Sequence, residues 1–162
     1  MKPLISIVIP SNNRTELLDE AIVSIITDPG WNSDCELCIS DNTEGDETAN
    51  LIHTKYSGSS QIFYRRSLDA PSLDENLNMA ISMASGEYAW FFGDDDLIVE
   101  NFLAELITYL KSSSPDSVIL NSCSFQDQGQ VEASRLPLDN SIVYGPNDND
   151  LFLTDQGGYL TY

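Results

Sequence analysis

Short apolar runs alternate with amphipathic segments over most of the chain. The run at 4–9 (LISIVI) is continuous and rich in β-branched residues, which is typical of a strand buried on both faces of a sheet. After a polar loop, apolar residues recur at helical spacing between Leu17 and Ile26, which indicates a helix with one buried face. Strands separated by helices need crossover connections, so the sequence predicts an α/β fold with a doubly wound, mostly parallel sheet.

The same plan repeats along the chain. We expect strands at 4–9, 36–40, 61–65, 88–92 and 117–125, with a sixth at 141–144. Helices are expected from Thr15 or Glu16 to Pro29, at 46–55, at 73–84 and around 102–110. A length of 162 residues is enough for one domain or slightly more.

The charge balance excludes several classes of partner. The chain has 26 Asp and Glu against 7 Lys and Arg, which gives a formal net charge of −19. Nucleic acids and anionic membrane surfaces both require clustered basic residues, so we expect neither as a partner. No stretch approaches the roughly 18 apolar residues of a membrane-spanning helix. His53 is the single histidine, which excludes histidine triads and multi-histidine zinc sites.

The three cysteines form no disulfide framework, and an odd number suits a reducing compartment, so we expect a cytoplasmic protein. Cys35 and Cys38 have the spacing of a redox or zinc half-site. However, they fall in an expected strand and have no second half-site, so we interpret both as core residues. We expect His53 to lie on the surface, and Trp31 and Trp90 to serve in packing.

Ligands of open parallel sheets bind at the carboxyl ends of the strands, so the residues after each strand are the informative ones. Here these are 10–14, 41–46, 65–69 and 93–96. Neither the G-x-G-x-x-G nor the G-x-x-x-x-G-K-[ST] phosphate loop is present in the sequence. Arg14, Arg65 and Arg66 are the basic residues at these ends.

The strongest single motif is GDDD at 93–96, which follows the apolar run YAWFF. Crowded carboxylates repel one another, and a hard divalent cation such as Mg²⁺ or Mn²⁺ relieves that repulsion. Such a cation would also compensate for the few basic residues available to bind a diphosphate. The alternative interpretation is that the acids open a helix beginning near Leu97.

Three blocks then occur in the order in which one protein family carries them. They are PLISIVIPSNNRTELLDEAIVSI, ELCISDNTEGDET, and Asn78-x-x-Ile81-x-x-Ala84-x-Gly86-Glu87-Tyr88 leading into GDDD. Over roughly residues 3–110 the sequence resembles the family 2 glycosyltransferases of GT-A fold. Trp90-x-x-Gly93 before the three acids is most similar to the abequosyltransferase-like subgroup, which builds bacterial surface polysaccharide.

The resemblance implies a role for each matching residue. Asp41 would accept a hydrogen bond from the base, Asp94 would face the ribose, and Asp95, with Asp96 close by, would bind the metal. The remaining residues expected to contact the nucleotide sugar or support its loop are Pro10, Asn13, Arg14, Asp46 and Asn78. The sequence departs from the family at Asn12, Asn42 and Leu77, where a tyrosine, an aspartate and an arginine are usual. Arg65 or Arg66 would compensate for that missing arginine; the alternative interpretation is that the two arginines form a solvated strand end.

The expected function is an inverting, metal-dependent glycosyltransferase with Mn²⁺ or Mg²⁺ as cofactor. It would move a sugar from a nucleotide diphosphate donor to a hydroxyl of a saccharide or lipid-linked saccharide. The alternatives are a non-catalytic nucleotide- or cation-binding module and a sugar-1-phosphate nucleotidyltransferase, although the latter carries a glycine-rich, lysine-containing loop that SNNR does not match.

We expect a donor-binding domain at 1–125 and an incomplete acceptor-side region at 126–162, truncated at the C-terminus. The catalytic base is then expected beyond Tyr162, with Asp148, Asp150 and Asp155 as the late acids available instead. Apolar residues near the C-terminus predict self-association through that edge. We expect a cytoplasmic location, peripheral to the inner membrane through the acceptor.

Overall fold

The computed structural model describes residues 2–69, 72–120, 122–126 and 130–134. The chain divides into two compact units, Met1–Pro115 and Asp116–Tyr162. The boundary expected at 125/126 lies further along the chain than this division. The late acids Asp148, Asp150 and Asp155, the expected strand at 141–144 and the apolar C-terminal residues all lie outside the described residues.

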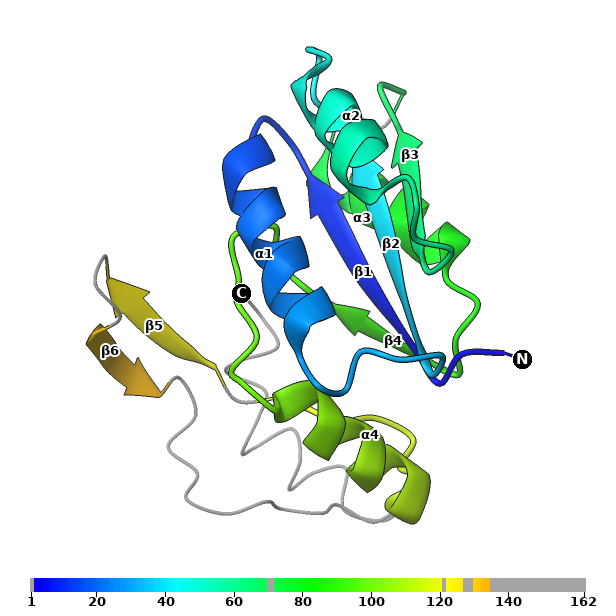
Figure 1. The fold of residues 1–162 in the computed structure, drawn as a ribbon, viewed down its shortest axis with the longest axis vertical. Coiled ribbons are helices and arrows are strands. Elements are labelled where there is room, and N and C mark those ends of the chain that lie inside the picture. The colour runs from blue at the N-terminus through cyan, green and yellow to red at the C-terminus, as the bar shows by residue number, and fades with distance from the viewer. Residues whose placement is uncertain (1, 70–71, 121, 127–129, 135–162) are drawn as a thin grey trace. The chain divides into compact units, whose positions relative to one another are not determined.

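The first unit is built on a four-stranded parallel sheet (Figure 1). Its strands are β1 (Ile5–Ser11), β2 (Cys35–Asp41), β3 (Ile62–Arg66) and β4 (Tyr88–Phe91), in the order β3-β2-β1-β4. β1 and β2 are the central pair, and almost every residue in them is buried. The predicted α/β class, with apolar runs as central parallel strands, is therefore confirmed.

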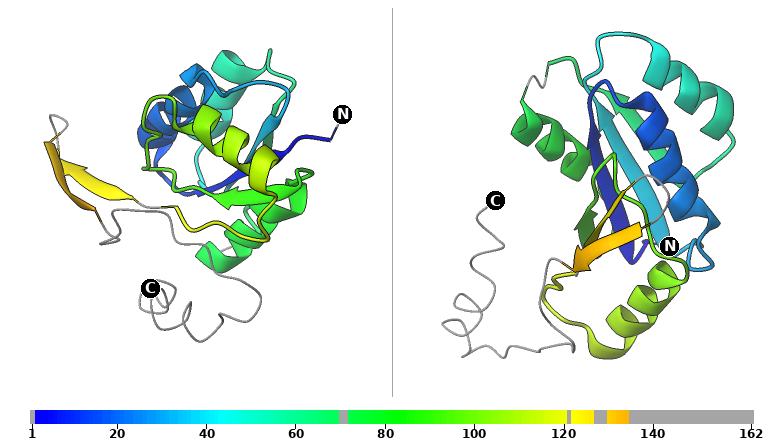
Figure 2. Two further views of the ribbon diagram at one scale, coloured as in Figure 1. Left: turned by 90° about the horizontal axis from the view of Figure 1, so that it is seen from below. Right: turned by 90° about the vertical axis from the view of Figure 1, so that its left-hand side faces the viewer.

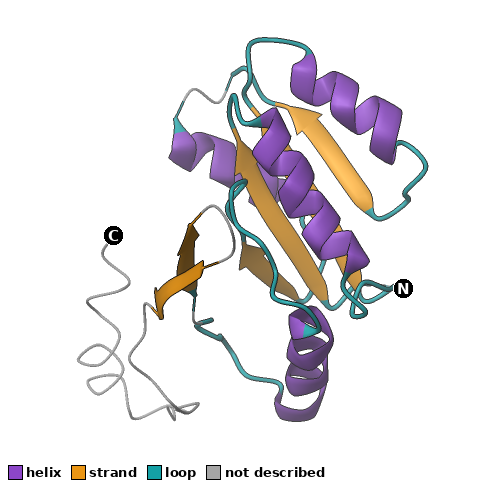
Figure 3. Cartoon of the chain, turned by 60° about the vertical axis from the view of Figure 1, so that its left-hand side comes forward, coloured by secondary structure: helices purple, strands orange, loops and turns teal. Residues whose placement is uncertain are grey.

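Helices cover both faces of this sheet. α1 (Thr15–Thr27) and α2 (Glu47–Leu51) lie on one face and α3 (Leu73–Met83) on the other, as Figure 2 and Figure 3 show. The last turn of the second helix is a π-helical segment, η1 (Ile52–Tyr56). α1 buries the face that its apolar spacing predicts, through Leu18, Ala21, Ile22 and Ile25.

α3 begins with a capping box and packs on the sheet through small and apolar residues. The Ser72 hydroxyl accepts a hydrogen bond from the Glu75 N–H, and the Glu75 carboxylate accepts one from the Ser72 N–H. Ala80 packs with Val8 and Cys38 in the core, and Leu77 contacts this cluster. Leu77 is thus a packing residue, which explains why an apolar side chain suits this position.

α4 (Phe102–Ser113) buries Leu103, Leu106, Ile107 and Leu110. It begins well after Leu97, so the interpretation of the three acids as a helix start is wrong. A turn and an irregular segment separate the acids from the helix. A Cβ on Gly30 would lie 2.3 Å from the backbone nitrogen of Ala104, so only glycine allows the segment before β2 to approach α4 this closely.

The second unit contains a hairpin rather than the parallel strand expected at 117–125. β5 (Cys123–Gln126) and β6 (Gln130–Ser134) pair antiparallel in a separate two-stranded sheet. A nearby antiparallel partner needs only a tight connection, whereas a parallel one needs a crossover. Residues 117–120 form no strand.

The expected roles of the isolated residues agree with their placement. Cys35 and Cys38 are buried free thiols, and burial raises the pKa of Cys38 to about 12. His53 is exposed, with its ring edge-on to Tyr64. Trp90 packs against Phe92 and Phe102. In the described part of the chain, no helix has both the length and the hydropathy to cross a membrane.

Candidate functional site

The candidate site lies at the edge of the sheet where its parallel strands end. Ser11, the last residue of β1, is in register with Asp41 of β2, and Asp41 is in register with Arg66 of β3. The loops that follow these strands therefore start side by side, as the carboxyl ends of a parallel sheet require.

Asp94 is the buried acid of the GDDD segment and is tied to β1 and α1. It is 6% exposed, although its side chain is polar. Its Oδ2 accepts a hydrogen bond from the Ser11 hydroxyl at 3.0 Å, and its Oδ1 accepts one from Arg14 Nη1 at 3.0 Å. A buried carboxylate needs such partners, and they fix its position at the strand ends.

Asp95 is the exposed acid of the same segment. Arg14 Nη1 also donates to Asp95 Oδ2, at 2.8 Å, so one nitrogen bridges two carboxylates. The side chains of Arg14 and Asp95 are both 50% exposed. The charge of Asp94 and its hydrogen bond, followed by the charge of Asp95, raise the pKa of Arg14.

Asp96 turns back on its own segment, because its Oδ2 accepts a hydrogen bond from the Gly93 N–H at 3.2 Å. The described residues contain no group of three or more acids, cysteines or histidines arranged to hold a metal ion. However, Mg²⁺ is usually held by one or two carboxylates together with substrate phosphates and water. Asp95 fits such a shared site as the accessible ligand, whereas both oxygens of the adjacent Asp94 accept hydrogen bonds from Ser11 and Arg14.

The loop after β2 is organised around Asp41, which is fully buried. Its Oδ1 accepts a hydrogen bond from the Thr43 N–H at 2.9 Å and its Oδ2 accepts one from the Tyr64 hydroxyl at 2.8 Å. Burial and then this bond raise the pKa of Tyr64. Asn13, which has a φ of 55°, donates its N–H to the Thr43 hydroxyl at 2.8 Å. The loops after β1 and β2 are thus joined at Thr43.

The two arginines at the end of β3 differ in their surroundings. Arg66 Nη1 donates to Asp46 Oδ1 at 2.6 Å, and its Nη2 reaches backbone carbonyls of the same loop. Arg65 is exposed, and its side chain makes no hydrogen bond or ion pair within the described residues. In register it pairs with Ser40, so it points to the opposite face of the strand from Arg66.

A buried polar residue that the sequence analysis missed connects the strand ends. Asn76, in the first turn of α3, donates to the Ser11 carbonyl at 2.9 Å and accepts from the Ser40 hydroxyl at 2.6 Å. The Ser40 hydroxyl also lies 2.9 Å from that of Ser67, just after β3. The sequence does indicate that Asn76 is buried, because it lies four positions before Ala80 and therefore on the same face of α3.

Two other expected residues lie in β1 and on α3. Pro10 is a half-buried residue within β1. Asn78 is exposed and lines a depression of about 290 Å³ beside α3, together with Asp69, Glu75, Met79 and Ser82. None of these residues belongs to the GDDD segment.

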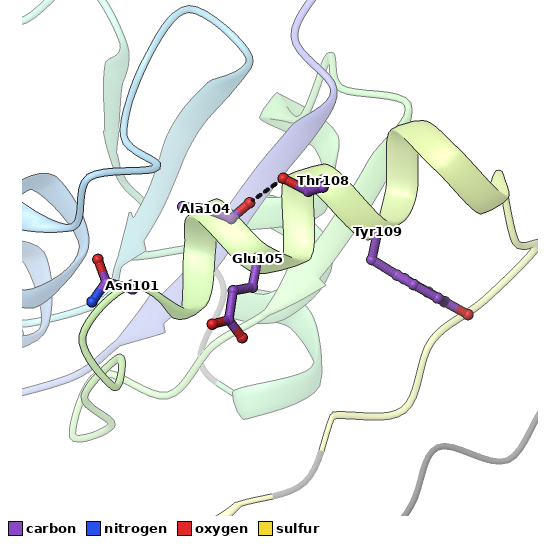
Figure 4. Close-up of a pocket in the computed structure, with 5 residues that line it drawn as sticks. All are labelled: Asn101, Ala104, Glu105, Thr108 and Tyr109. Carbon is purple, nitrogen blue, oxygen red and sulfur yellow. Dashed lines mark hydrogen bonds between the residues drawn. The ribbon is translucent and has the colours of Figure 1, made fainter.

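A second depression, of about 410 Å³, runs along the outer face of α4 (Figure 4). It is lined by Asn101, Ala104, Glu105, Thr108 and Tyr109, and Thr108 uses its hydroxyl within the helix by donating to the Ala104 carbonyl. With a single acid and no basic residue, this surface has neither the paired carboxylates nor the arginine of the strand-end site.

The parallel sheet and the acidic edge opposite Arg14 define an α/β domain of the GT-A type. Residues 6–154 match the model of the family described as Glycosyl transferase family 2. The chain therefore belongs to glycosyltransferase family 2.

Curated relatives agree with this assignment. Abequosyltransferase RfbV of Salmonella typhimurium is 40% identical over 112 residues, which cover 68% of this chain and 34% of the relative. This likeness supports the abequosyltransferase-like subgroup. Poly(ribitol-phosphate) β-N-acetylglucosaminyltransferase TarP of Staphylococcus aureus is 31% identical over 71% of this chain and 35% of its own. The chain thus spans about a third of the length of these relatives.

Solved structures share the fold. Residues 1–349 of TarS from S. aureus align with a TM-score of 0.62 at 19% identity, covering 68% of this chain and 33% of that one. The same TarS segment in complex with UDP aligns with a TM-score of 0.58 at 18% identity, over 68% and 33% of the two chains.

Proposed function

We propose that this chain is the donor-binding part of an inverting, metal-dependent glycosyltransferase of bacterial surface polysaccharide synthesis. The donor would be a nucleotide diphosphate sugar and the acceptor a hydroxyl of a saccharide or lipid-linked saccharide. The reaction would form a bond from the acceptor oxygen to the anomeric carbon and break the bond from that carbon to the diphosphate. We propose a cytoplasmic location for it.

The observation that carries this proposal is the position of Asp94. Asp94 is 6% exposed at the ends of the parallel strands, where Ser11 and Arg14 hold its carboxylate. Burying a carboxylate costs free energy, and a purely structural loop does not need one at this position. Its neighbour Asp95 presents an exposed carboxylate from the same turn. One fixed and one accessible acid suit the two tasks of orienting a sugar hydroxyl and binding a cation.

Asp95 would hold Mn²⁺ or Mg²⁺, with Asp94 and Asp96 adjacent. When bound, such an ion neutralises negative charge on a departing diphosphate. Arg14 already lies against both acids and supplies positive charge at the same place. In a chain of net charge −19, local positive charge of this kind is what an anionic ligand needs.

The nucleoside would bind along the loops that meet at Thr43. Asn13, Asp41 and Asp46 belong to these loops, and Pro10 leads into them from β1. The printed names of similar proteins support a nucleotide donor and a polymer or lipid-linked acceptor. TarS has been solved with UDP and with UDP-GlcNAc. A Campylobacter jejuni relative, 26% identical over 80% of this chain and 41% of its own, is named for a GalNAc(5)-diNAcBac-PP-undecaprenol acceptor.

We assign the role of catalytic base to none of the described residues. The late acids Asp148, Asp150 and Asp155 lie outside the described part of the chain. A non-catalytic nucleotide- or cation-binding module stays the second candidate, because the chain spans only about a third of its enzymatic relatives.

A thermal-shift screen of UDP, CDP, GDP and dTDP, each with Mn²⁺, Mg²⁺ or EDTA, tests the donor-binding part. At least one diphosphate should raise the unfolding temperature with metal, and the shift should largely disappear with EDTA. Sugar transfer or donor hydrolysis in the presence of Mn²⁺ separates the enzyme from the binding module. Donor binding without any turnover would favour the module.

A further inference from the structure

Arg66 lies against the backbone of the loop that follows β2. Its Nη2 donates to the carbonyl oxygens of Glu44 at 2.5 Å and Gly45 at 2.8 Å, with a longer contact of 3.4 Å to that of Thr43. Its Nη1 donates to Asp46 Oδ1 at 2.6 Å. One side chain therefore contacts four successive residues of the loop.

These contacts need the shape of a guanidinium. Arginine presents five N–H donors in a rigid planar fork, whereas lysine presents one compact ammonium. The three carbonyls are all contacted from Nη2, whereas the Asp46 carboxylate is contacted from Nη1, so two nitrogens of the planar fork divide the contacts between them. The contacts thus depend on hydrogen-bond geometry as well as on charge.

The position of Arg66 satisfies the loop but leaves one of its own hydrogen-bond donors without an acceptor in the part of the chain that the structure describes. Its Nε–H is buried and has no acceptor among the described residues. Unsatisfied buried donors are uncommon in folded proteins, and they are found where another requirement fixes the side chain. Here that requirement is the Nη contact with the loop.

The same loop is fixed from its other side by Asp41 and Asn13. Asp41 accepts the Thr43 N–H at 2.9 Å, and Asn13 donates to the Thr43 hydroxyl at 2.8 Å. Residues at the ends of β1, β2 and β3 thus meet on one short segment. Among these residues, Arg66 is the one that hydrogen-bonds the backbone carbonyls of Glu44 and Gly45, between Thr43 and Asp46.

We propose that Arg66 is a positioning residue for nucleoside recognition, which acts by fixing the loop at 43–46, and not a contact to the diphosphate. This inference rests on the proposed function, in which that loop binds the nucleoside. The two arginines of β3 then differ in role, because within the described range 2–69 the guanidinium of Arg66 is hydrogen-bonded to backbone carbonyls of the loop and that of Arg65 is not.

The test compares Arg66→Lys and Arg66→Gln with the unaltered 162-residue chain. Isothermal titration in Mn²⁺ measures two probes: the nucleoside diphosphate that binds best among UDP, CDP, GDP and dTDP, and inorganic pyrophosphate. Both variants should bind the nucleoside diphosphate about tenfold more weakly, on the scale of one lost charged hydrogen bond. Pyrophosphate affinity should stay within about twofold.

Lys111→Ala is the matched control, because it removes one positive charge and one ion pair, with Asp34, next to the start of β2. It should leave both affinities unchanged. If Arg66→Lys binds the nucleoside diphosphate as well as the unaltered chain does, charge alone suffices and the inference is wrong. A parallel loss of pyrophosphate affinity in both variants overturns it too, since it places Arg66 at the diphosphate. If the unaltered chain binds no nucleoside diphosphate, the proposed function itself fails, and this inference fails with it.

Discussion

Arg14 and Asp94 are 80 positions apart in the chain, and their side chains meet at 3.0 Å. The contact joins the residue before α1 to the acidic turn after β4. Because the same Arg14 nitrogen also reaches Asp95 at 2.8 Å, one guanidinium forms ion pairs with two adjacent carboxylates and offsets only one of their two negative charges. Any cation that binds these acids meets Arg14 there.

Asp95→Ala should abolish metal-linked nucleotide binding without unfolding the protein. Ligand that binds only the folded state adds about 2.7 kcal/mol at a hundredfold excess over Kd, so the loss is measurable by thermal shift. The apo protein should keep its unfolding temperature, since Asp95 is half-exposed. Glu87→Ala, which removes an exposed acid just before β4, serves as the control and should bind normally. Equal nucleotide affinity in Asp95→Ala and the unaltered chain would remove Asp95 from the metal site.

Arg14→Ala should make the acids more available to a cation alone. Mn²⁺ affinity in the absence of nucleotide should rise severalfold, because the competing guanidinium is gone. The additional affinity that pyrophosphate gives to Mn²⁺ should fall, because Arg14 no longer contributes charge to the anion. Titration followed by the electron paramagnetic resonance of free Mn²⁺ measures both quantities. Weaker Mn²⁺ binding in the absence of anion would show that Arg14 organises the acids and does not compete at them.

Asp41→Asn tests the base contact while preserving side-chain shape. An amide can still accept the Thr43 N–H, but it presents N–H donors where the carboxylate accepted. Asp41 is fully buried in the structure, so the base contact implied by the family resemblance requires the loop to open; loss of that charged hydrogen bond should cost about 1.5–3 kcal/mol of nucleoside diphosphate binding. Pyrophosphate binding with Mn²⁺ should be unchanged by calorimetry. Tyr64→Phe keeps the Asp41 carboxylate and removes only the hydroxyl that donates to it at 2.8 Å. Comparing its nucleoside diphosphate affinity with that of Asp41→Asn separates loss of the base contact from loss of order in the loop. If pyrophosphate affinity falls in parallel, Asp41 belongs to the phosphate side of the site.

Glu36→Gln should destabilise the domain in a pH-dependent way without affecting ligand binding. Glu36 is buried, and it accepts hydrogen bonds from the Ser6 hydroxyl at 2.6 Å and the Ser85 N–H at 2.5 Å. Burial by itself raises the pKa of Glu36, but these donors outweigh it, and the pKa is lowered. The ionised form therefore stabilises the fold above the ordinary pKa of glutamate, and this stabilisation is lost as the pH falls through the lowered value.

Urea unfolding at pH 7 should show Glu36→Gln less stable by about 1.5–3 kcal/mol, and the difference should narrow toward about pH 3. A difference that stays constant with pH would mean that packing, and not ionisation, causes the loss. Nucleotide affinity of the folded variant should match that of the unaltered chain, because Glu36 lies near the start of β2 and the site lies at its end.

The central strands could be predicted from sequence because most of their residues are apolar. A strand covered on both faces is apolar over most of its length, and the β-branched run at 4–9 is typical of such a strand. The acidic turn at 93–96 was also recognisable, because three carboxylates directly after an apolar strand have few structural explanations. Its partner Arg14 was identified by its place in the loop, but the direct contact between them depends on how β1 and β4 pair.

What sequence patterns missed are relationships between segments. In the sequence, Asn76 is one polar residue among several in a helix. Once α3 packs on the sheet, it hydrogen-bonds both Ser11 and Ser40. The strand expected at 117–125 failed for a related reason. Local apolar character does not say whether a strand will cross over to the parallel sheet or pair with the segment that follows it.

The strand order also has a consequence for how the site forms during folding. In the described part of the chain, β4 pairs with β1 and with no other strand, over four residue pairs. The Ser11–Asp94 hydrogen bond closes a sequence separation of 83, whereas β1 and β2 come together over a much shorter connection. Contacts that close longer loops carry a larger entropic cost, so β4 is expected to dock late and to detach early in local opening. Detachment of this one short strand would dismantle the acidic turn while the other three strands and their helices persist, so ligand affinity in this domain also measures how firmly β4 is docked.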